Sequence, residues 1–310
     1  MSKILVVFGA TGQQGGSVIN SVVNDPELSS QYKIRAVTRD PSKAGAQALK
    51  ARGVEVVKGD SGDKESLVLV MQGAHTIFAM TVTIYDDHTK ERELAEGKAM
   101  GDAAVAAGAQ YFIFNTMPHI ERLSGGKFQH ASSWDGRAEV EEYIRTLPIK
   151  SAFFSPASFM QNYTGMMSPK PMGDGTYAIA GVVSPQTQIP LIDAAVDTGK
   201  YVGAILAEPE KYEGRVFSAA TKLYTLDEIA QHLAEATGKI VKYNQLPESV
   251  FRGFLPPHAA EPLIEMFLWI QDFGYFGLQT KELVDWAARN ARGELTTFEE
   301  YLADHPLNLE

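Results

Sequence analysis

The residues with the clearest chemical meaning lie near the start of the chain, directly after a short apolar run. There, Gly9-Ala-Thr-Gly12-Gln-Gln-Gly15 places three glycines at intervals of three residues. Between a buried strand and a helix, Gly9 permits a sharp turn, Gly12 lets backbone N–H groups approach a pyrophosphate, and Gly15 lets the helix lie close to the strand. A bare glycine pattern is weak evidence, but its place before an apolar helix predicts a dinucleotide site.

The residues after the second apolar run indicate which dinucleotide would bind. In Thr38-Arg39-Asp40-Pro41-Ser-Lys43, two cations stand where an NAD-binding protein places an acid against the ribose. Arg39 and Lys43 together could balance a 2′-phosphate, and the planar guanidinium of Arg39 could stack on adenine. Alternatively, Asp40 is the ribose acid, but an Asp before a proline is typical of a helix N-cap. The segment therefore favours NADP(H) over NAD(H).

Two further positions would belong to this site in a parallel sheet, because each follows an apolar run. Asp60 could accept a hydrogen bond from the adenine amino group, or it could cap a helix or a turn. Thr81 would run beside the ribose and the nicotinamide, where backbone contacts are expected.

The glycine pattern resembles the short-chain dehydrogenase/reductase superfamily, whose enzymes use Tyr-x-x-x-Lys to protonate the carbonyl that receives hydride. None of the 12 tyrosines has Lys four residues later. The corresponding segment reads Ser133-Trp-Asp-Gly-Arg137. Arg137 has helical spacing from Val140 and Ile144, which places it on the apolar side of a helix. Its partner would be either the cofactor's ribose or nicotinamide amide, or an acid in a structural salt bridge.

Other candidates for proton transfer are weak. Arg137 keeps its proton at any working pH, and Ser133 is a poor acid. His119 and His130 are the nearby groups that titrate near neutrality, although a lone His is usually structural. The seven histidines show no metal-ligand spacing, so no metal is expected.

The elements that must position these residues follow from an alternation of short apolar runs with amphipathic stretches. The expected strands are Ile4–Phe8, Ile34–Thr38, Val54–Lys58, Thr76–Met80, Tyr111–Asn115 and Ser151–Ser155. The expected helices between them are Gly12–Asn24, Ser42–Arg52, Lys64–Met71, Lys90–Ala107 and Trp134–Leu147. Parallel strands need right-handed crossovers, so this order predicts a doubly wound α/β sheet of the Rossmann type.

The rhythm changes after Ser155, which predicts a Rossmann domain over residues 1–155 and a smaller mixed C-terminal lobe over residues 156–310, with some segments able to return to the sheet. Two capping boxes are expected to open helices, at Thr225-Leu-Asp-Glu228 and at Thr296-Thr-Phe-Glu299. Pro262–Phe273 is apolar nearly all the way round. Such a helix is either buried against the sheet or covers a ligand cleft or a partner.

Composition excludes several classes of protein. The chain has 310 residues, 45% of them hydrophobic, which fits an ordinary globular protein rather than a disordered or fibrous one. A net charge of −10 without a basic cluster argues against direct nucleic-acid binding. The absence of Cys removes thiol chemistry. No membrane span or signal peptide is recognisable, so the expected location is the cytoplasm, with the nucleus open.

Several segments together resemble the NmrA-like family of atypical short-chain dehydrogenases. They are Gly9-Ala-Thr-Gly-Gln-Gln-Gly-Gly-Ser17-Val18, Val37-Thr-Arg39-Asp-Pro, Gly59-Asp60, Gly136-Arg137-Ala-Glu-Val-Glu-Glu-Tyr143, Phe159-Met-Gln-Asn162 and Pro209-Glu-Lys-Tyr-Glu-Gly214. The resemblance implies a cleft between the two lobes that binds NAD(P). It carries cofactor contacts over to Gly9, Thr11, Gly12, Gln13, Gly15, Arg39 and Lys43. The chain departs from related proteins at Arg137, where they often have Lys, and this weakens the case for reductase activity.

The resemblance also implies two kinds of function. Family members act as nucleotide or redox sensors that control transcriptional regulators through protein contacts, and some relatives transfer hydride. An intact cofactor loop beside a missing Tyr/Lys pair favours the sensor, in which NADP(H) alters the C-terminal lobe or a homodimer and so changes the affinity for a protein partner. The alternative is an NADPH-dependent oxidoreductase that reduces a quinone, enone or carbonyl substrate in a cleft lined by Phe159, Asn162, Trp269 and Phe273.

Overall fold

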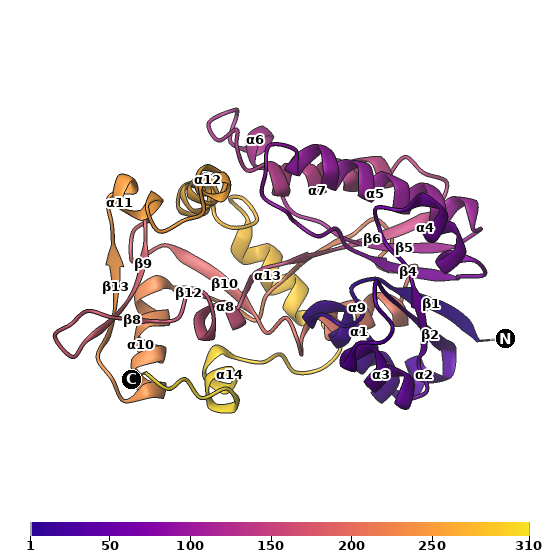
Figure 1. Ribbon diagram of the computed structural model, residues 1–310, viewed down its shortest axis with the longest axis horizontal. Coiled ribbons are helices and arrows are strands. Elements are labelled where there is room, and N and C mark those ends of the chain that lie inside the picture. Colours follow the sequence, from indigo (N-terminus) through magenta and orange to yellow (C-terminus); the bar gives the residue numbers. More distant parts are fainter. Residues whose placement is uncertain (1, 310) are drawn as a thin grey trace.

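The computed structural model describes residues 2–309, and its centre is a parallel sheet of seven strands (Figure 1). The strand order is β11-β6-β5-β4-β1-β2-β3. The strands are β1 (Lys3–Val7), β2 (Tyr32–Thr38), β3 (Glu55–Lys58), β4 (Thr76–Ala79), β5 (Tyr111–Asn115), β6 (Lys150–Pro156) and β11 (Val216–Ala219). The strand order reverses between β1 and β4, where sheets of this kind open a crevice for ligands. The predicted doubly wound fold is confirmed.

The seventh strand, β11, is not evident from the sequence pattern. It comes from the C-terminal half of the chain and pairs in parallel with β6, with Phe217 opposite Phe154. Both phenylalanines are fully buried. The edge of the sheet beyond β6 is therefore completed by a segment that follows much of the C-terminal lobe.

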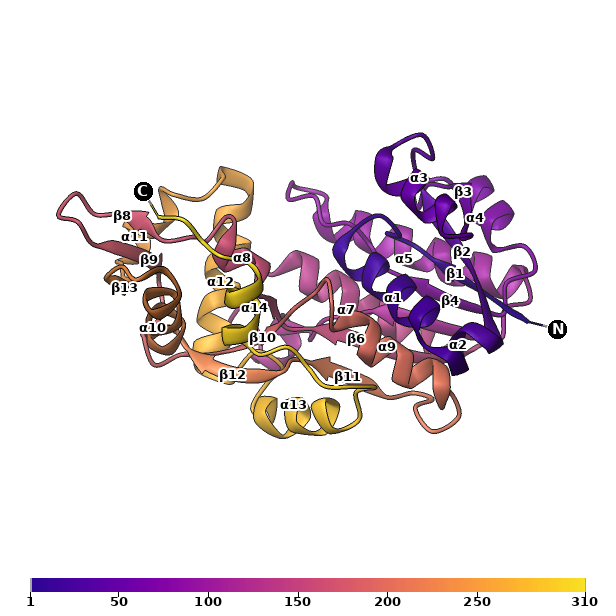
Figure 2. The same cartoon turned by 90° about the horizontal axis from the view of Figure 1, so that it is seen from below.

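Helices cover both faces of the sheet (Figures 1 and 2). One face carries α1 (Gln13–Asn24), α2 (Pro26–Gln31), α3 (Ala44–Ala51) and α9 (Thr198–Ala207), and the other carries α4 (Lys64–Met71), α5 (Thr89–Ala106) and α7 (Ser132–Ile144). Successive residues of a strand point to opposite faces. Leu5 and Val7 accordingly join the core under α1, whereas Val6 and Phe8 join the core under α4 and α5.

α5 and α7 pack closely because small residues face the neighbouring helix. A Cβ atom on Gly97 would collide with the Val140 side chain, and one on Gly101 would lie 2.8 Å from a methyl carbon of Leu147. The polar residues one turn earlier on these helices are therefore brought together as well. Glu93 on α5 and Arg137 on α7 are the pair that this packing joins.

Two predicted helix starts are wrong, because the residue expected to cap each helix forms its hydrogen bonds with another nearby polar group. α3 begins at Ala44 after Lys43, and Asp40 instead closes an earlier turn, where its Oδ1 accepts from the Ser42 N–H at 2.9 Å. Thr296 donates its N–H and hydroxyl to Asp197, at 3.0 and 3.1 Å. The capping box of the last helix therefore forms one residue later, between Thr297 and Glu300.

The C-terminal half builds two small mixed sheets and a set of helices (Figure 2). One sheet contains β7 (Ser158–Phe159), β10 (Gln188–Ile192) and β12 (Lys222–Thr225), and the other β8 (Lys170–Pro171), β9 (Tyr177–Gly181) and β13 (Val241–Gln245). The remaining helices are α6 (Ile120–Leu123), α8 (Gln161–Thr164), α10 (Leu226–Thr237), α11 (Glu248–Arg252), α12 (Pro257–Phe273), α13 (Thr280–Arg289) and α14 (Phe298–Asp304). The predicted box at Thr225 is confirmed, and its helix ends at Gly238, which has the left-handed conformation at φ 66°.

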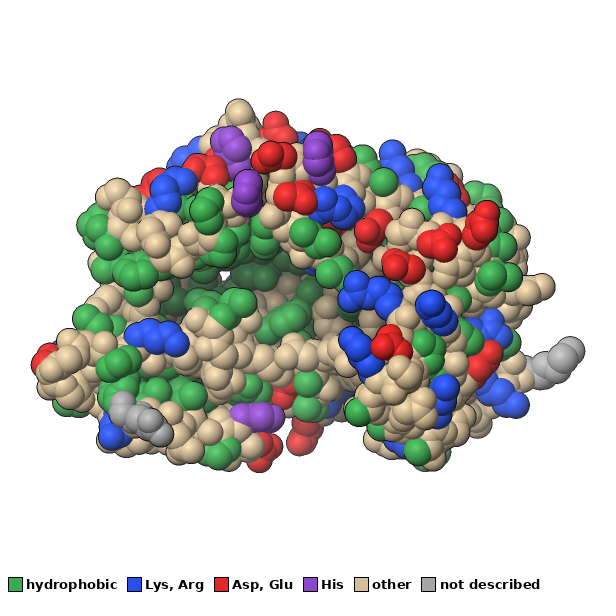
Figure 3. Space-filling view, in the orientation of Figure 1, with side chains coloured by type: hydrophobic (Ala, Val, Ile, Leu, Met, Phe, Trp, Pro, Cys, Tyr) green, Lys and Arg blue, Asp and Glu red, His purple; other side chains and the backbone are tan. Residues whose placement is uncertain are grey.

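α12, the predicted apolar helix, is buried on one side only. Ile264, Trp269 and Ile270 belong to the large core, while Leu263 and Phe267 remain partly exposed. The space-filling view shows a hollow between the part of the molecule that carries α6, α7 and α12 and the part that carries α1, α8 and α14 (Figure 3). Hydrophobic side chains line this hollow, so α12 both packs on the core and stands at its edge.

No helix within residues 2–309 combines the length and the apolar character needed to cross a membrane.

Candidate functional site

The glycine loop lies at the switch point, between the end of β1 and the start of α1. Gly9 has φ +63°, which an L side chain rarely adopts, and its carbonyl accepts from the Gly12 N–H at 2.9 Å. A Cβ atom on Gly15 would fall far inside contact distance of the Gly9 carbonyl. The turn therefore requires glycine at position 9, and the approach of helix to strand requires it at position 15.

The N-terminus of α1 is open toward this loop. Gly12 is the N-cap and offers no side-chain acceptor, and the first turn holds no acidic residue. Thr11, Gly12 and Gln13 are exposed. The free N–H groups and the positive end of the helix dipole thus face an accessible space, which suits a phosphate.

Arg39 and Lys43 stand beside this loop with free charges. Both are exposed, and within residues 2–309 neither side chain makes a hydrogen bond or an ion pair. The start of α3 touches the loop, since a Cβ on Gly45 would lie 3.6 Å from the Thr11 side chain. The nearest acid, Asp40, is turned into its own loop, where hydrogen bonds from Ser42 lower the pKa of its carboxyl. Lys and Arg side chains gather beside the hollow over this end of the molecule (Figure 3).

Asp60, the candidate for the adenine amino group, also closes a turn. Its Oδ1 accepts from the Gly62 N–H at 3.0 Å, and its own N–H donates to the Ser66 hydroxyl at 3.1 Å. The second carboxylate oxygen has no hydrogen bond within residues 2–309, and the residue is exposed. The sequence left Asp60 either a contact with adenine or the capping of a helix or a turn, and the structure shows that it caps a turn.

Thr81 and Arg137 meet in a buried cluster at the end of β4. Glu93, only 2% exposed, lies at the centre of this cluster. Its carboxylate accepts from the hydroxyls of Thr81 and Thr83 and from Arg137 Nε, the last at 3.1 Å. Arg137 Nη2 also donates to Thr83 Oγ1 at 2.8 Å. Arg137 is thus held by a structural salt bridge, the second of the alternatives open from the sequence.

Glu93 and Thr83 are site residues that the sequence reading missed. A signal was available for Glu93, because it shares a helical face with Gly97, Met100 and Ala104, all of them buried. An acid on such a face requires a buried cation or hydrogen-bond donors.

The two histidine candidates lie against carboxylates that do not belong to this cluster. His119 is buried between Asp135, at 3.1 Å, and Glu139, at 3.4 Å. His130 lies 2.8 Å from Glu265 on α12, which raises the pKa of its imidazole through their hydrogen bond. Glu261 completes a group whose potential ligand atoms all lie within 4.8 Å of one another, although no metal was expected from spacing. Neither histidine points to the end of β4 through any contact that the structure shows.

Two buried polar atoms near the crevice lack partners within residues 2–309. Asn115 ends β5 and donates through Nδ2 to Gln14 Oε1 on α1, at 3.1 Å. This bond leaves the Asn115 Oδ1 acceptor and the Gln14 Nε2 donor unsatisfied. Buried polar atoms in native proteins normally have partners. An unpaired acceptor and donor at this place match the two groups of a carboxamide, so the residues fit a nicotinamide dinucleotide.

The residues expected to line a substrate cleft are only partly at a surface. Phe159 and Asn162 are half-buried at the start of the C-terminal lobe. Trp269 is 1% exposed and stacks on Phe273, with ring centroids 4.7 Å apart. Its expected role as a cleft wall is wrong, because its ring lies in the core and its Nε1 donates to the Tyr275 carbonyl at 3.3 Å. Tyr275, which was not expected from the sequence, packs on Trp134 of α7, and the charge of Arg137 acts on its hydroxyl.

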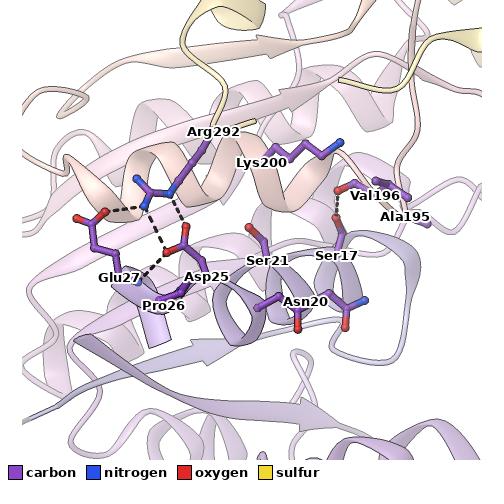
Figure 4. Close-up of a pocket in the computed structure, with 11 residues that line it drawn as sticks. Ser17, Asn20, Ser21, Asp25, Pro26, Glu27, Ala195, Val196, Lys200 and Arg292 are labelled. Carbon is purple, nitrogen blue, oxygen red and sulfur yellow. Dashed lines mark hydrogen bonds and ion pairs between the residues drawn. The ribbon is translucent and has the colours of Figure 1, made fainter. Parts of the chain in front are cut away.

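A separate polar cavity of about 720 Å³ lies between α1, α9 and Arg292 (Figure 4). Its cations are already paired: Arg292 with Asp25 at 2.6 Å and Lys200 with Asp197 at 2.7 Å. Ser17 donates across the seam to the Val196 carbonyl at 2.9 Å. These contacts join the helices of the two halves and leave no free positive charge for a phosphate.

The NmrA-like family matches residues 1–302. A curated relative from a Cladobotryum species, the NmrA-like family domain-containing oxidoreductase FrzB, is 29% identical over 78% of this chain and 76% of its own length. Among solved structures, NmrA, a negative transcriptional regulator, has been solved with NAD and with NADP. It has a TM-score of 0.80 and 24% identity, and covers 97% of this chain and 94% of its own.

The NADPH-dependent quinone oxidoreductase QOR2 of Escherichia coli, solved with NADPH, has a TM-score of 0.76 and 23% identity, with 97% of this chain and 99% of its own covered. At these identities the two solved structures support the fold alone. The full-length match to one family is the stronger finding.

Proposed function

The chain belongs to the NmrA-like family, and from this premise we propose that it binds NADP(H) at the glycine loop. One observation carries the proposal: an uncapped α1 N-terminus stands beside two cations, Arg39 and Lys43, whose side chains make no hydrogen bond or ion pair within residues 2–309. The helix terminus would take the pyrophosphate and the cations the 2′-phosphate. The carboxamide would meet Asn115 and Gln14.

Calorimetric titration with NADPH, NADP, NADH and NAD tests this proposal. We expect micromolar binding of NADPH and weaker binding of NADH, because NADH lacks the phosphate that the two cations would contact. Failure of all four nucleotides to bind below the millimolar range would overturn the proposal.

The glycine loop offers a matched pair of variants. Gly15→Ala places a methyl group against the Gly9 carbonyl, and we expect NADPH affinity to fall at least about fivefold, since overpacking of this kind costs roughly 1–3 kcal/mol. In Gly16→Ala the new carbon would lie 3.7 Å from the Ala10 carbonyl, an ordinary contact. This control should bind NADPH almost as the wild type does.

We further propose that the bound cofactor reduces a quinone, enone or carbonyl compound. The hollow beside α12 and α7 has hydrophobic walls (Figure 3), and α7 also carries Arg137 of the cluster at the end of β4, where the nicotinamide would end. A flat apolar acceptor would suit such walls. Support also comes from the relative FrzB, which is called an oxidoreductase.

Loss of NADPH absorbance with a panel of quinones, enones and aldehydes tests the reduction. We expect turnover with at least one planar member of the panel. Inertness across the whole panel, together with tight NADPH binding, would contradict reduction.

The second candidate is a sensor that regulates a protein partner. The salt bridge of Arg137 with Glu93 favours it, because a cation already compensated at the nicotinamide end has less to offer a reaction. Cofactor occupancy would then have to favour one conformation or one oligomeric state over another. Three results together would support the sensor over the reductase. NADPH would bind tightly, no acceptor would be reduced, and NADPH would change the sedimentation of the protein or the hydrogen exchange of its C-terminal lobe.

A further inference from the structure

Tyr275 lies at the junction of the two halves of the molecule. It follows α12 after Gly274, whose φ of +83° turns the chain. The tyrosine ring packs against Trp134 of α7, with centroids 4.9 Å apart, and against Phe276, also at 4.9 Å. The Tyr275 carbonyl accepts from the Trp269 indole. The ring is therefore fixed from both the sheet side and the α12 side.

The hydroxyl of Tyr275 is free, unlike those of several other buried tyrosines. Tyr32, Tyr111, Tyr201 and Tyr243 each donate their hydroxyl to a backbone carbonyl, at 2.8 to 3.1 Å. Within residues 2–309 no group forms a hydrogen bond with the Tyr275 hydroxyl. Its oxygen also does not belong to the fully buried polar atoms that lack a partner, so it keeps some accessible surface. It is thus a buried phenol whose polar end is open to a small molecule.

Arg137 is the cation next to this phenol. It lies one helical turn after Trp134 on α7, and its charge acts on the Tyr275 hydroxyl. Glu93 and Thr83 hold Nε and Nη2, whereas Nη1 makes no hydrogen bond within the described residues. The salt bridge therefore fixes the guanidinium and leaves one of its nitrogens unoccupied.

We propose that Tyr275 is the catalytic proton donor of the reduction and that Arg137 is a positioning residue that stabilises the phenolate left behind. This inference rests on the proposed reductase function. For a simple carbonyl, the substrate carbon accepts a hydride from NADPH, the C=O π pair moves to oxygen, and that oxygen takes the Tyr275 proton. For a quinone, one carbonyl oxygen accepts the hydride, the π electrons shift through the ring, and the other carbonyl oxygen takes the Tyr275 proton. Water then returns a proton to the phenolate, so that the sum is NADPH, H⁺ and the carbonyl or quinone giving NADP⁺ and the alcohol or hydroquinone.

The protonation state of the phenol follows from its environment. Burial raises the pKa of Tyr275, and the charge of Arg137 only partly opposes this rise. The phenol therefore carries its proton at neutral pH, where it can act as an acid and not as a base. We expect reduction near pH 7, whereas oxidation of the corresponding alcohol, which needs the phenolate as base, should require alkaline pH.

Tyr275→Phe removes only the free hydroxyl and should leave the fold intact. With menadione as acceptor, we expect kcat to fall by about 100-fold or more, the usual worth of a positioned acid. The KM for menadione should change less than about threefold, because the ring that packs on Trp134 is kept. A readout independent of turnover is the quenching of tryptophan fluorescence by menadione without NADPH, which should match the wild type.

Tyr85→Phe is the matched control, since Tyr85 is the neighbouring phenol whose charge would also act on Tyr275. It should keep near wild-type kcat. In addition, 3,5-difluorotyrosine at position 275, a stronger acid of nearly the same size, should move the alkaline limb of the kcat/KM profile to lower pH.

The outcomes separate the two proposals. Wild-type turnover with unchanged kcat in Tyr275→Phe, or an unmoved pH profile with difluorotyrosine, would overturn the role of Tyr275 and leave the reductase standing. Absence of wild-type turnover across the acceptor panel would overturn both.

Discussion

Two arginines stand at opposite ends of the proposed cofactor site, and their surroundings differ. Arg39, after β2, is exposed and has no partner for its charge within residues 2–309. Arg137, on α7, is 19% exposed and is held by Glu93 and Thr83. The first end presents charge that a ligand must neutralise, and the second end has its charge neutralised by the protein. Affinity for a phosphate should thus come from the first end, and fixed geometry for chemistry from the second.

The largest expected effect comes from removing the acid that neutralises Arg137 at the second end, which we call the closed end. Glu93→Ala leaves Arg137 with only the Thr83 hydroxyl, and breaking a buried pair of this kind typically costs about 3 kcal/mol or more. Urea unfolding should show the loss. Glu91→Ala, on the exposed side of the same helix, should change stability by less than about 0.5 kcal/mol.

The double variant Glu93→Met with Arg137→Met refines this test, because it removes both charges at once. We expect it to recover most of the stability lost in Glu93→Ala. If Glu93→Ala unfolds at the wild-type urea concentration, the contrast between the two ends is wrong.

At the first end, which we call the open end, Arg39→Ala should weaken NADPH binding and leave the free energy of unfolding unchanged. A charge-assisted hydrogen bond is worth about 1.5–3 kcal/mol, so we expect roughly a tenfold to hundredfold rise in the Kd for NADPH. NADH, which has no 2′-phosphate, should lose much less. Arg52→Ala is the control, because Arg52 ends α3 and already bonds to Asn20. Equal losses for NADPH and NADH would refute the assignment of Arg39 to the phosphate.

Between the two ends, Asn115→Leu tests the unpaired amide pair. It removes the free acceptor and the bond to Gln14, and a neutral hydrogen bond to the carboxamide is worth about 1 kcal/mol, or roughly fivefold in Kd. The loss should appear for NADPH and NADH alike and should vanish for 2′,5′-ADP, which has no nicotinamide. Calorimetry with all three ligands separates these cases, and a loss that extends to 2′,5′-ADP would contradict the assignment.

The smallest effect concerns His130, which links the segment before α7 to Glu265 on α12. Its pKa is raised above the ordinary value of 6.5, so the link stabilises the fold at acid pH and is lost as the pH rises through the raised value. His130→Gln should cost less than about 1 kcal/mol near pH 5.5 and almost nothing near pH 8.5, because the imidazole is largely exposed. Urea unfolding of the wild type and of the variant at both pH values measures this loss of stability. A loss that is the same at both pH values would contradict the prediction.

The open end could be predicted from the sequence because its residues are close in the chain. Gly9, Gly15, Arg39 and Lys43 sit on the first two βα units, and their conformational or electrostatic roles follow from local spacing. The sheet was predictable for the same reason, strand by strand. Asp40 shows the limit, since its carboxylate closes its own turn on Ser42, and α3 begins after Lys43 without a side-chain cap.

The closed end could not be predicted, because distant segments build it. Glu93 reaches Arg137 only through the packing of α5 on α7. Tyr275 reaches the same place from the far end of α12, after more than a hundred intervening residues. A search for Tyr-x-x-x-Lys assumes that phenol and cation lie on one helix, whereas here the cation lies on α7 and the phenol in the turn after α12.

The pairing of β6 with β11 has a consequence during synthesis. The backbone edge of β6 is available once residue 156 is made, but its partner follows about 60 residues later. At about 5–20 residues per second, the ribosome needs roughly 3 to 12 s to deliver β11. For that interval the nascent sheet has an apolar strand with unpaired N–H and C=O groups at its edge, the kind of surface that neighbouring chains on a polysome can extend. Chaperone demand for this protein should therefore peak while the segment between β6 and β11 is being translated.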